Sequence, residues 1–231
     1  MIRCVLTDIE GTTSSIDFVH KVLFPYAKLH LPEFVRANVK DERVTSAISE
    51  VQETVLTEES RTISYEGVIE KLLYWIDSDR KHPALKRLQG YIWKAGYEEG
   101  AFRGHVYGEV RGIMDKWVKA GIRLAVYSSG SEEAQKLLFR YSEAGDLSGY
   151  FSWYFDTSVG HKRESASYHA ISKAINIPRE DILFLSDITD ELDAARESNF
   201  KTIQLVRDNT RPGKLHPVAK DFGEVNAMMD L

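Results

Sequence analysis

A short apolar run near the start of the chain ends in acidic residues, and this feature most constrains the fold. The run from Ile2 to Leu6 is largely apolar and too short for a helix, so it predicts a buried parallel strand. Asp8 then lies at the C-terminal end of that strand, where open α/β sheets bind their ligands. Gly11 permits a sharp turn directly afterwards. We therefore expect an α/β sheet with a ligand site at this strand end.

The residues of this turn carry groups suited to chemistry on an anion. Asp8 and Glu10 are separated by one residue, so their side chains point the same way along an extended chain. A nucleophile and a general acid/base acting on one substrate need that arrangement. Thr12 and Thr13 follow and can offer hydrogen bonds to an anion. The alternative is a turn at the strand end whose acids only face water. A cation, a phosphate-binding loop and a metal site elsewhere in the chain would favour the catalytic interpretation.

Composition limits the class of protein. The 231 residues are 43% hydrophobic and 28% charged, as in ordinary globular proteins. A net charge of −5 disfavours nucleic acid as a partner, and no stretch reads as a membrane span or a signal peptide. The single Cys4 excludes an intrachain disulfide and a cysteine zinc site. We expect a cytoplasmic monomer with neither a membrane nor a nucleic-acid partner.

A long helical block follows the first strand. The first helix is expected from Asp17 to His30, with Pro32 marking its exit. Three further helices are predicted from apolar residues at helical spacing: Val44, Ile48, Val51 and Val55; Tyr65, Ile69, Leu72 and Ile76; Leu85, Leu88, Ile92 and Ala95. No strand signal interrupts this block. We predict a helical cap domain over residues 14–101, which can exclude water from a site; plain helical packing on the sheet is the alternative.

The remaining chain alternates helices with strands. A strong amphipathic helix with apolar residues from Val106 to Val118 is stopped by Gly121. The further predicted strands are Arg123–Tyr127, Trp153–Phe155, Ile182–Leu185 and Thr202–Val206. Alternation of this kind predicts a doubly wound parallel sheet. The predicted core domain is therefore residues 1–13 with 102–231, of the α/β class.

Two loops after predicted strands carry groups that suit a phosphate. Ser128, Ser129 and Gly130 precede a helix that Ser131 can cap, and free amides at such a helix start attract anions. Lys162 follows a glycine in the loop after the next strand and offers a fixed cation for a charged transition state. The alternative for Lys162 is a solvated side chain, which is the commoner case for a lone lysine in a loop. We expect the neighbouring His161 to be a surface residue or to lie at the fringe of the substrate site.

A further acid marks the end of the fourth predicted strand. Asp187 is expected to converge with Asp8, because the carboxyl ends of parallel strands meet at one edge. Carboxylate oxygens of this kind suit Mg²⁺. Asp190 and Glu191 lie in the following turn, where acidic residues compensate the helix dipole; we adopt this interpretation for Asp190 but not for Asp187, which precedes the helix.

These motifs, in this order, resemble those of haloacid dehalogenase superfamily phosphatases. The matching residues are Asp8-Ile9-Glu10-Gly11-Thr12, Ser128, Lys162 and Ser186-Asp187. Within that superfamily the chain resembles the enolase-phosphatases of methionine salvage over nearly its whole length. The narrower match rests on Asp8 to Thr13, Tyr127 to Ser131, Phe155-Asp156-Thr157, Gly160-His161-Lys162 and Ser167-Tyr168. Most of the superfamily carries Asp where this chain has Glu10, which agrees with the enolase-phosphatase branch.

The resemblance implies conversion of 2,3-diketo-5-methylthiopentyl 1-phosphate to 1,2-dihydroxy-3-keto-5-methylthiopentene and phosphate. It implies that Asp8 is the nucleophile and Glu10 the acid/base. It also implies that the phosphate is held by Lys162 together with Thr12, Ser128, Ser129 and Gly130. Mg²⁺ would be bound by Asp8, Glu10 and Asp187.

Other functions fit parts of the pattern. The nearest alternative is a capped phosphatase of the same superfamily that acts on a sugar phosphate or phosphoglycolate. A dehalogenase would need neither Asp187 nor Glu10. A phospho-acceptor signalling domain shares the Asp and Lys at strand ends but has no large helical insertion. A purely structural or interaction protein would leave these converging groups without a role.

Overall fold

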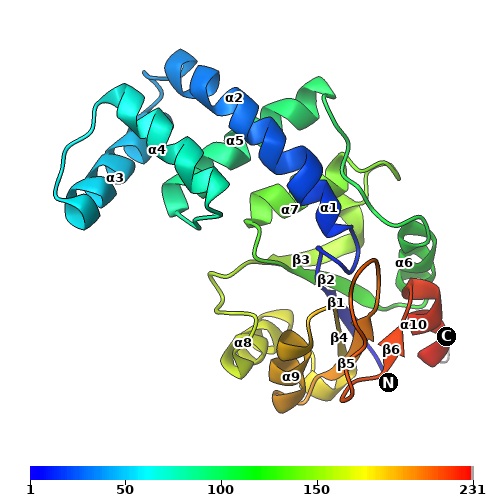
Figure 1. Ribbon diagram of the computed structural model, residues 1–231. Helices are drawn as coiled ribbons and strands as arrows, with labels where there is room; N and C mark the ends of the chain where they lie inside the picture. The colour runs from blue at the N-terminus through cyan, green and yellow to red at the C-terminus, as the bar shows by residue number, and fades with distance from the viewer. Residues whose placement is uncertain (230–231) are drawn as a thin grey trace. The chain divides into compact units, whose positions relative to one another are not determined.

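The computed structural model describes residues 1–229, and its chain divides into two compact units. One unit comprises Met1–Phe18 and the chain from Arg103 onward, and the other comprises Val19–Phe102. The first unit contains the sheet and the second is helical (Figure 1). The assignment of residues 14–101 to a cap domain stays a prediction.

A six-stranded parallel sheet forms the centre of the first unit, which confirms the predicted fold class. The strands are β1 Cys4–Thr7, β2 Arg123–Tyr127, β3 Phe151–Phe155, β4 Ile182–Ser186, β5 Lys201–Leu205 and β6 Val218–Ala219. Their spatial order is β3-β2-β1-β4-β5-β6. Because β1 lies between β2 and β4, its C-terminal end is flanked by the loops that follow those two strands. The acids after β1 therefore meet the residues after β2 and β4.

Helices cover both faces of this sheet (Figure 1). The helices of this unit are α1 Ile16–Phe18, α6 Val110–Lys119, α7 Glu132–Arg140, α8 Ser165–Ile175, α9 Thr189–Glu197 and α10 Phe222–Met228, with short 3₁₀ turns at Ser148–Tyr150 and Arg179–Asp181. The predicted helix before β2 begins later than its apolar pattern, since Val106 lies in the preceding loop. Ser131 caps α7 as predicted, with its hydroxyl accepting from the Ala134 amide.

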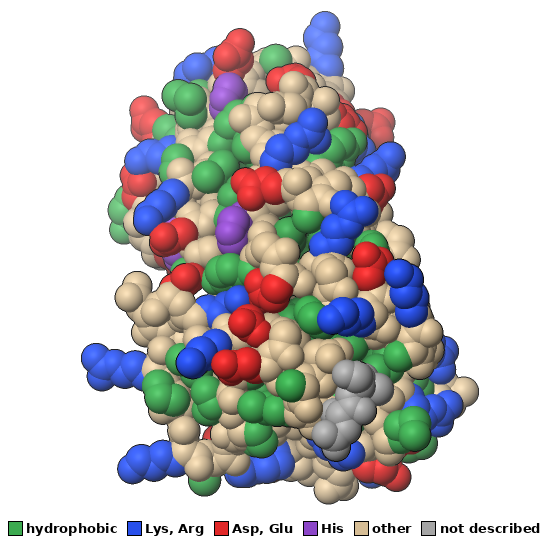
Figure 2. Space-filling model, turned by 90° about the vertical axis from the view of Figure 1, so that its right-hand side faces the viewer, with side chains coloured by type: hydrophobic (Ala, Val, Ile, Leu, Met, Phe, Trp, Pro, Cys, Tyr) green, Lys and Arg blue, Asp and Glu red, His purple; other side chains and the backbone are tan. Residues whose placement is uncertain are grey.

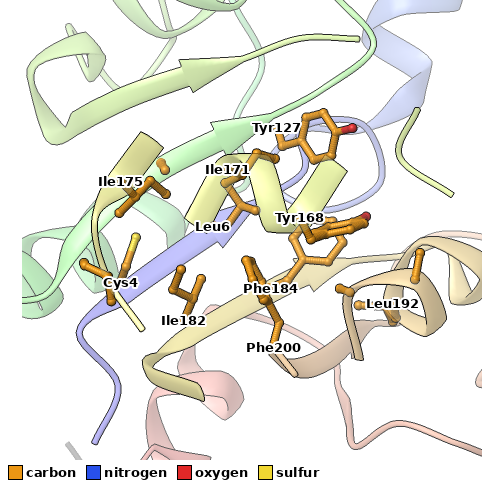
Figure 3. Close-up of a cluster of buried hydrophobic side chains, with 14 residues drawn as sticks. Cys4, Leu6, Tyr127, Tyr168, Ile171, Ile175, Ile182, Phe184, Leu192 and Phe200 are labelled. Carbon is orange, nitrogen blue, oxygen red and sulfur yellow. The ribbon is translucent and has the colours of Figure 1, made fainter. Parts of the chain in front are cut away.

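The core beneath α8 and α9 reaches up to the loop that carries Lys162. Figure 3 shows aliphatic and aromatic side chains of β1, β4 and these helices packed together, with Tyr127 and Tyr168 at one end of the cluster. The ring centroids of these two tyrosines lie 5.7 Å apart in an edge-to-face arrangement. Both side chains are fully buried, so their hydroxyls need partners inside the protein.

The helical unit is built from amphipathic helices around its own core. A π-helix Val19–Leu23 leads into α2 Phe24–Ala37, followed by α3 Glu42–Glu59, α4 Tyr65–Asp77 and α5 Pro83–Glu99. The side chains of Asp41, Ser64 and His82 cap the last three helices. The predicted helices after residue 40 are therefore confirmed.

The expected exit of the first helix at Pro32 is wrong, because α2 continues through Pro32 to Ala37. The ring removes one helical hydrogen bond and costs roughly 3 kcal/mol. Ala27, Leu31 and Val35 are fully buried on both sides of the proline. Burial of this continuous apolar face outweighs the local cost.

The surface mixes charges of both signs. On the face drawn in Figure 2, acidic and basic side chains are interspersed with apolar ones. Among residues 1–229, no helix combines the length and the apolar character that crossing a membrane requires.

Candidate active site

Asp8 is held firmly at the end of β1. Its amide donates to the Leu185 carbonyl at 2.9 Å, and its own carbonyl accepts from the hydroxyls of Thr7 and Thr13 at 2.9 and 3.2 Å. The Thr13 hydroxyl was expected to be available to an anion, but it donates to the backbone instead. Asp8 Oδ1 accepts from the Ile9 amide at 2.7 Å, and the residue is only 3% exposed.

Lys162 is a buried cation shared by two carboxylates. Its ammonium lies 2.7 Å from Asp8 Oδ1 and 2.7 Å from Glu191 Oε2. Burial alone would lower the pKa of Lys162, but the Asp8 and Glu191 charges raise it above its ordinary value. Lys162 is therefore not the solvated loop lysine that is the commoner case.

Three hydroxyl groups fix the backbone that carries this lysine. The side chains of Tyr127, Ser167 and Tyr168 donate to the successive carbonyls of residues 160–162, at 2.8, 2.7 and 2.6 Å. The two tyrosines belong to the core in Figure 3. The exposed side chain of His161 contrasts with the buried Lys162 beside it, as the prediction of a fringe residue requires.

Glu10 is connected to the loop after β2. Ser128 Oγ donates to Glu10 Oε2 at 3.0 Å and accepts from the Gly130 amide at 3.1 Å. Desolvation within the site, and then the Asp8 charge, raise the pKa of the Glu10 carboxyl. A carboxyl with a raised pKa can carry a proton near neutral pH, as a general acid must.

The loop at residues 128–130 differs from the predicted cradle of free amides. The Ser128 amide donates to the Phe155 carbonyl at 3.2 Å, and the Gly130 amide to Ser128 Oγ. Ser129 is exposed. Gln135 holds the loop by donating to the carbonyls of Gly130 and Phe155, both at 2.8 Å. The amides of Ser128 and Gly130 are therefore already paired within the protein, and the Ser128 hydroxyl is itself bonded to Glu10.

Thr12 is buried beside the acids. It is 0% exposed, and its hydroxyl has no hydrogen-bond partner among the described residues. An orphaned buried hydroxyl is uncommon. Its role in substrate binding stays a prediction.

Asp187 and Gly11 form a close contact that suits a cation. A Cβ atom built on Gly11 would lie 2.5 Å from Asp187 Oδ2, so only glycine lets this carboxylate approach the turn after Asp8. Burial and the Asp8 charge raise the pKa of Asp187 to about 7. Carboxylates that destabilise one another in this way fit a divalent cation. Among residues 1–229, no group of three or more His, Cys, Asp or Glu side chains is placed to hold a metal ion.

Glu191 is the site residue that the sequence reasoning missed. It is 9% exposed, and besides Lys162 it accepts from Ser186 Oγ at 2.9 Å. Burial and the Asp8 charge raise its pKa. The buried Ala195 lies four residues further along α9 and so on the same face. That spacing was the available signal that Glu191 points inward, whereas Asp190 is exposed as expected.

A cavity of about 400 Å³ opens beside Asp187 within the sheet-containing unit. Asp187 and Gly11 line it, together with Ile16 and the loop at residues 207–211. Gln204 anchors that loop: its Nε2 donates to the carbonyls of Asp187 and Arg211 at 3.0 and 3.1 Å. The loop is therefore tied to the backbone of a predicted metal ligand.

Comparisons with known proteins show the family of this chain. A family model described as haloacid dehalogenase-like hydrolase matches residues 2–199. "Enolase-phosphatase E1" of Serratia proteamaculans is 49% identical over 98% of this chain and 97% of its own length. The protein of the same name from Marinobacter nauticus is 48% identical over 99% of each chain. The crystal structure of the UTR4 protein from Saccharomyces cerevisiae has a TM-score of 0.80 and 34% identity, over 97% of this chain and 100% of that one.

Proposed function

The chain belongs to the enolase-phosphatase E1 family of haloacid dehalogenase-like hydrolases, and on this premise we propose how its residues carry out the reaction. The substrate is 2,3-diketo-5-methylthiopentyl 1-phosphate, which is enolised and then dephosphorylated to 1,2-dihydroxy-3-keto-5-methylthiopentene. One observation carries the proposal. Asp8 and Glu10 follow the same strand, while Lys162 bonds the first and Ser128 bonds the second.

Asp8 is the nucleophile. The Ile9 amide and the Lys162 ammonium both bond Oδ1, which fixes the carboxylate and leaves Oδ2 to face a reacting group. Attack on phosphorus forms an aspartyl-phosphate and breaks the bond to the leaving oxygen. Lys162, Ser128 and Ser129 hold the phosphoryl oxygens in line, with Thr12 and Gly130 lining the turn around them.

Glu10 is the acid/base. Its raised pKa allows it to protonate the leaving oxygen and, once ionised, to activate the water that hydrolyses the aspartyl-phosphate. Enolisation also requires a base for a proton next to a carbonyl. Glu10 is our first candidate for that base, and a residue of the helical unit is the second.

The residues fit Mg²⁺ through the carboxylates of Asp8 and Asp187 and the backbone carbonyl of Glu10. When bound, Mg²⁺ supplies positive charge that neutralises the phosphoryl oxygens. The support from this chain is the Asp187–Gly11 contact and the mutual repulsion of Asp8 and Asp187, which raises the pKa of Asp187.

The helical unit Val19–Phe102 is proposed as a cap domain that determines which phosphate ester reacts. Its connection to the sheet-containing unit through both of its ends is compatible with an insertion. From the composition we also propose that the enzyme is a cytoplasmic monomer; sedimentation of the purified protein tests the monomer.

The direct test mixes purified protein, Mg²⁺ and the diketo phosphate, and follows enol absorbance and phosphate release together. We expect both signals, and their loss on addition of EDTA. The matched control is Glu197→Gln on the exposed face of α9, which retains both. Phosphate release only from sugar phosphates or phosphoglycolate would replace the substrate assignment. No release from any ester would overturn the enzyme assignment.

The role of Glu10 has its own test. We expect Glu10→Gln to lose both enol formation and phosphate release. Enol formation without hydrolysis would remove Glu10 from the enolisation step and assign that step to another base.

A further inference from the structure

Two segments of the sheet-containing unit lead into and out of the helical unit, and they are fastened to one another. The outgoing linker is residues 13–18, and the return linker is residues 103–109. The Ser15 amide donates to His105 Nδ1 at 3.0 Å, and the Tyr107 amide donates to the Thr13 carbonyl at 3.1 Å. One backbone–backbone and one backbone–side-chain hydrogen bond thus join the linkers, within one unit.

Asp208, in the loop after β5, bonds to both linkers with a single oxygen atom. Its Oδ2 accepts from Ser15 Oγ at 3.0 Å and from the Tyr107 hydroxyl at 2.7 Å. The hydrogen bond from Tyr107 contributes most to lowering the pKa of the Asp208 carboxyl, and that from Ser15 lowers it further. The acceptor is therefore charged at neutral pH. Hydrogen bonds to a charged group are stronger than those to a neutral one.

The backbone and the neighbouring residue hold Asp208 in place. Its φ of +48° is left-handed, a conformation that Asp and Asn tolerate better than most residues. Arg207 is 9% exposed, is ion-paired with Glu109 and lies 4.0 Å from the centre of the Tyr107 ring. Arg207 therefore anchors the loop to the return linker.

The outgoing linker and the Asp208 loop border the cavity next to the proposed metal ligand. Ile16 and Asp17 of the outgoing linker line it, together with Asp208 and its neighbours and with Asp187. A displacement of the outgoing linker from the Asp208 loop would therefore change the shape of this cavity. It would leave the Lys162–Asp8 and Ser128–Glu10 bonds in place, because those bonds involve neither segment.

We propose that Asp208 is a positioning residue that clasps the two linkers and thereby shapes the cavity that Asp187 lines. The clasp acts through Ser15 and Tyr107 and does not touch the reacting atoms. Its effect on turnover rests on the proposed function, whereas its effect on the linkers does not.

The test uses the full-length protein and compares Asp208→Ala with Asp208→Asn. Alanine removes both hydrogen bonds. Asparagine keeps an oxygen that can accept both and also tolerates the left-handed backbone. The matched control is Asp79→Ala, since Asp79 has a φ of +51° and an exposed side chain in the helical unit. It controls for alanine in a left-handed conformation.

The first readout is amide hydrogen exchange in peptides covering residues 13–18 and 103–109. For Asp208→Ala we expect exchange about tenfold faster in both peptides, as loss of a charge-assisted hydrogen bond predicts. Asp208→Asn should restore most of the protection, and Asp79→Ala should leave these peptides unchanged. Unchanged exchange in Asp208→Ala would overturn the clasp. If that variant fails to fold, the double variant S15A/Y107F removes both donors and carries the same test.

The second readout separates a positioning role from a merely structural one. With the diketo phosphate and Mg²⁺, we expect Asp208→Ala to raise KM about tenfold and to change kcat by less than about threefold. Faster exchange with unchanged KM and kcat would overturn the positioning role. If the wild-type protein does not turn over this substrate, the proposed function fails, and the exchange result still decides the clasp.

Discussion

The Tyr168 hydroxyl donates a hydrogen bond of 2.6 Å to the backbone carbonyl of Lys162. Tyr168 is fully buried and packs its ring against Phe184 of β4 and Phe200. The lysine that bonds Asp8 is thus fixed by the central core of the sheet. Packing there and the geometry of the site are therefore coupled.

Removal of this hydroxyl should affect both stability and activity. Tyr168→Phe keeps the ring but deprives the Lys162 carbonyl of its donor, so we expect a loss of about 1–3 kcal/mol in the free energy of unfolding. Because the lysine loses a constraint, kcat should fall as well. Urea denaturation and phosphate release measure the two effects. Tyr74→Phe, at a 60% exposed position, should change neither; equal effects of the two variants would contradict this coupling.

Glu191 and Asp8 both form ion pairs with the Lys162 ammonium. In Glu191→Gln the ammonium keeps only one anionic partner, Asp8, and bonds it more strongly, which makes Asp8 a weaker nucleophile. We expect kcat to fall about 10- to 100-fold, with a folded protein by circular dichroism. Glu197→Gln, on the exposed face of the same helix, is the control. Full activity of Glu191→Gln would show that Lys162 needs no second carboxylate.

The convergence of Asp8, Lys162 and Asp187 was accessible from the sequence because parallel strands place their ends together. Glu191 was missed because first-turn acids commonly serve the helix dipole, and its inward orientation depends on how α9 packs. Pro32 was misjudged because burial of Leu31 and Val35 outweighs a local preference. Asp208 had no local signal at all. Its partners Ser15 and Tyr107 are 193 and 101 residues away in the chain.

Gly160 should tolerate no side chain. Its φ is +133°, and a Cβ atom there would lie 2.3 Å from Ser167 Oγ, the group that holds the His161 carbonyl. We expect Gly160→Ala to cost more than about 1 kcal/mol of stability. Gly112→Ala, in α6 with nothing within 4 Å of the new Cβ, should gain about 0.5–1 kcal/mol. Thermal denaturation of both variants tests the contrast, and a stabilised Gly160→Ala would refute it.

His216 should make stability depend on pH. It is buried between Thr202 and Asp193, at 2.9 and 3.2 Å, with Arg196 of α9 the other charge acting on it. Burial lowers its pKa below the ordinary 6.5, so the unfolded state takes up the proton first and stability falls as the pH drops below that value. Between about pH 7 and pH 5, the wild-type protein should lose more stability than His216→Gln in urea denaturation. Identical losses would exclude His216 as the cause.

We expect Asp8 to become phosphorylated during turnover. The most direct measurement is an acid quench of protein, Mg²⁺ and the diketo phosphate on the millisecond scale, followed by peptide mass spectrometry. We predict one added phosphoryl group on Asp8 that appears before free phosphate accumulates, and neither adduct nor phosphate release in Asp8→Asn. Phosphate release without an adduct on Asp8, or release by Asp8→Asn, would contradict the covalent mechanism.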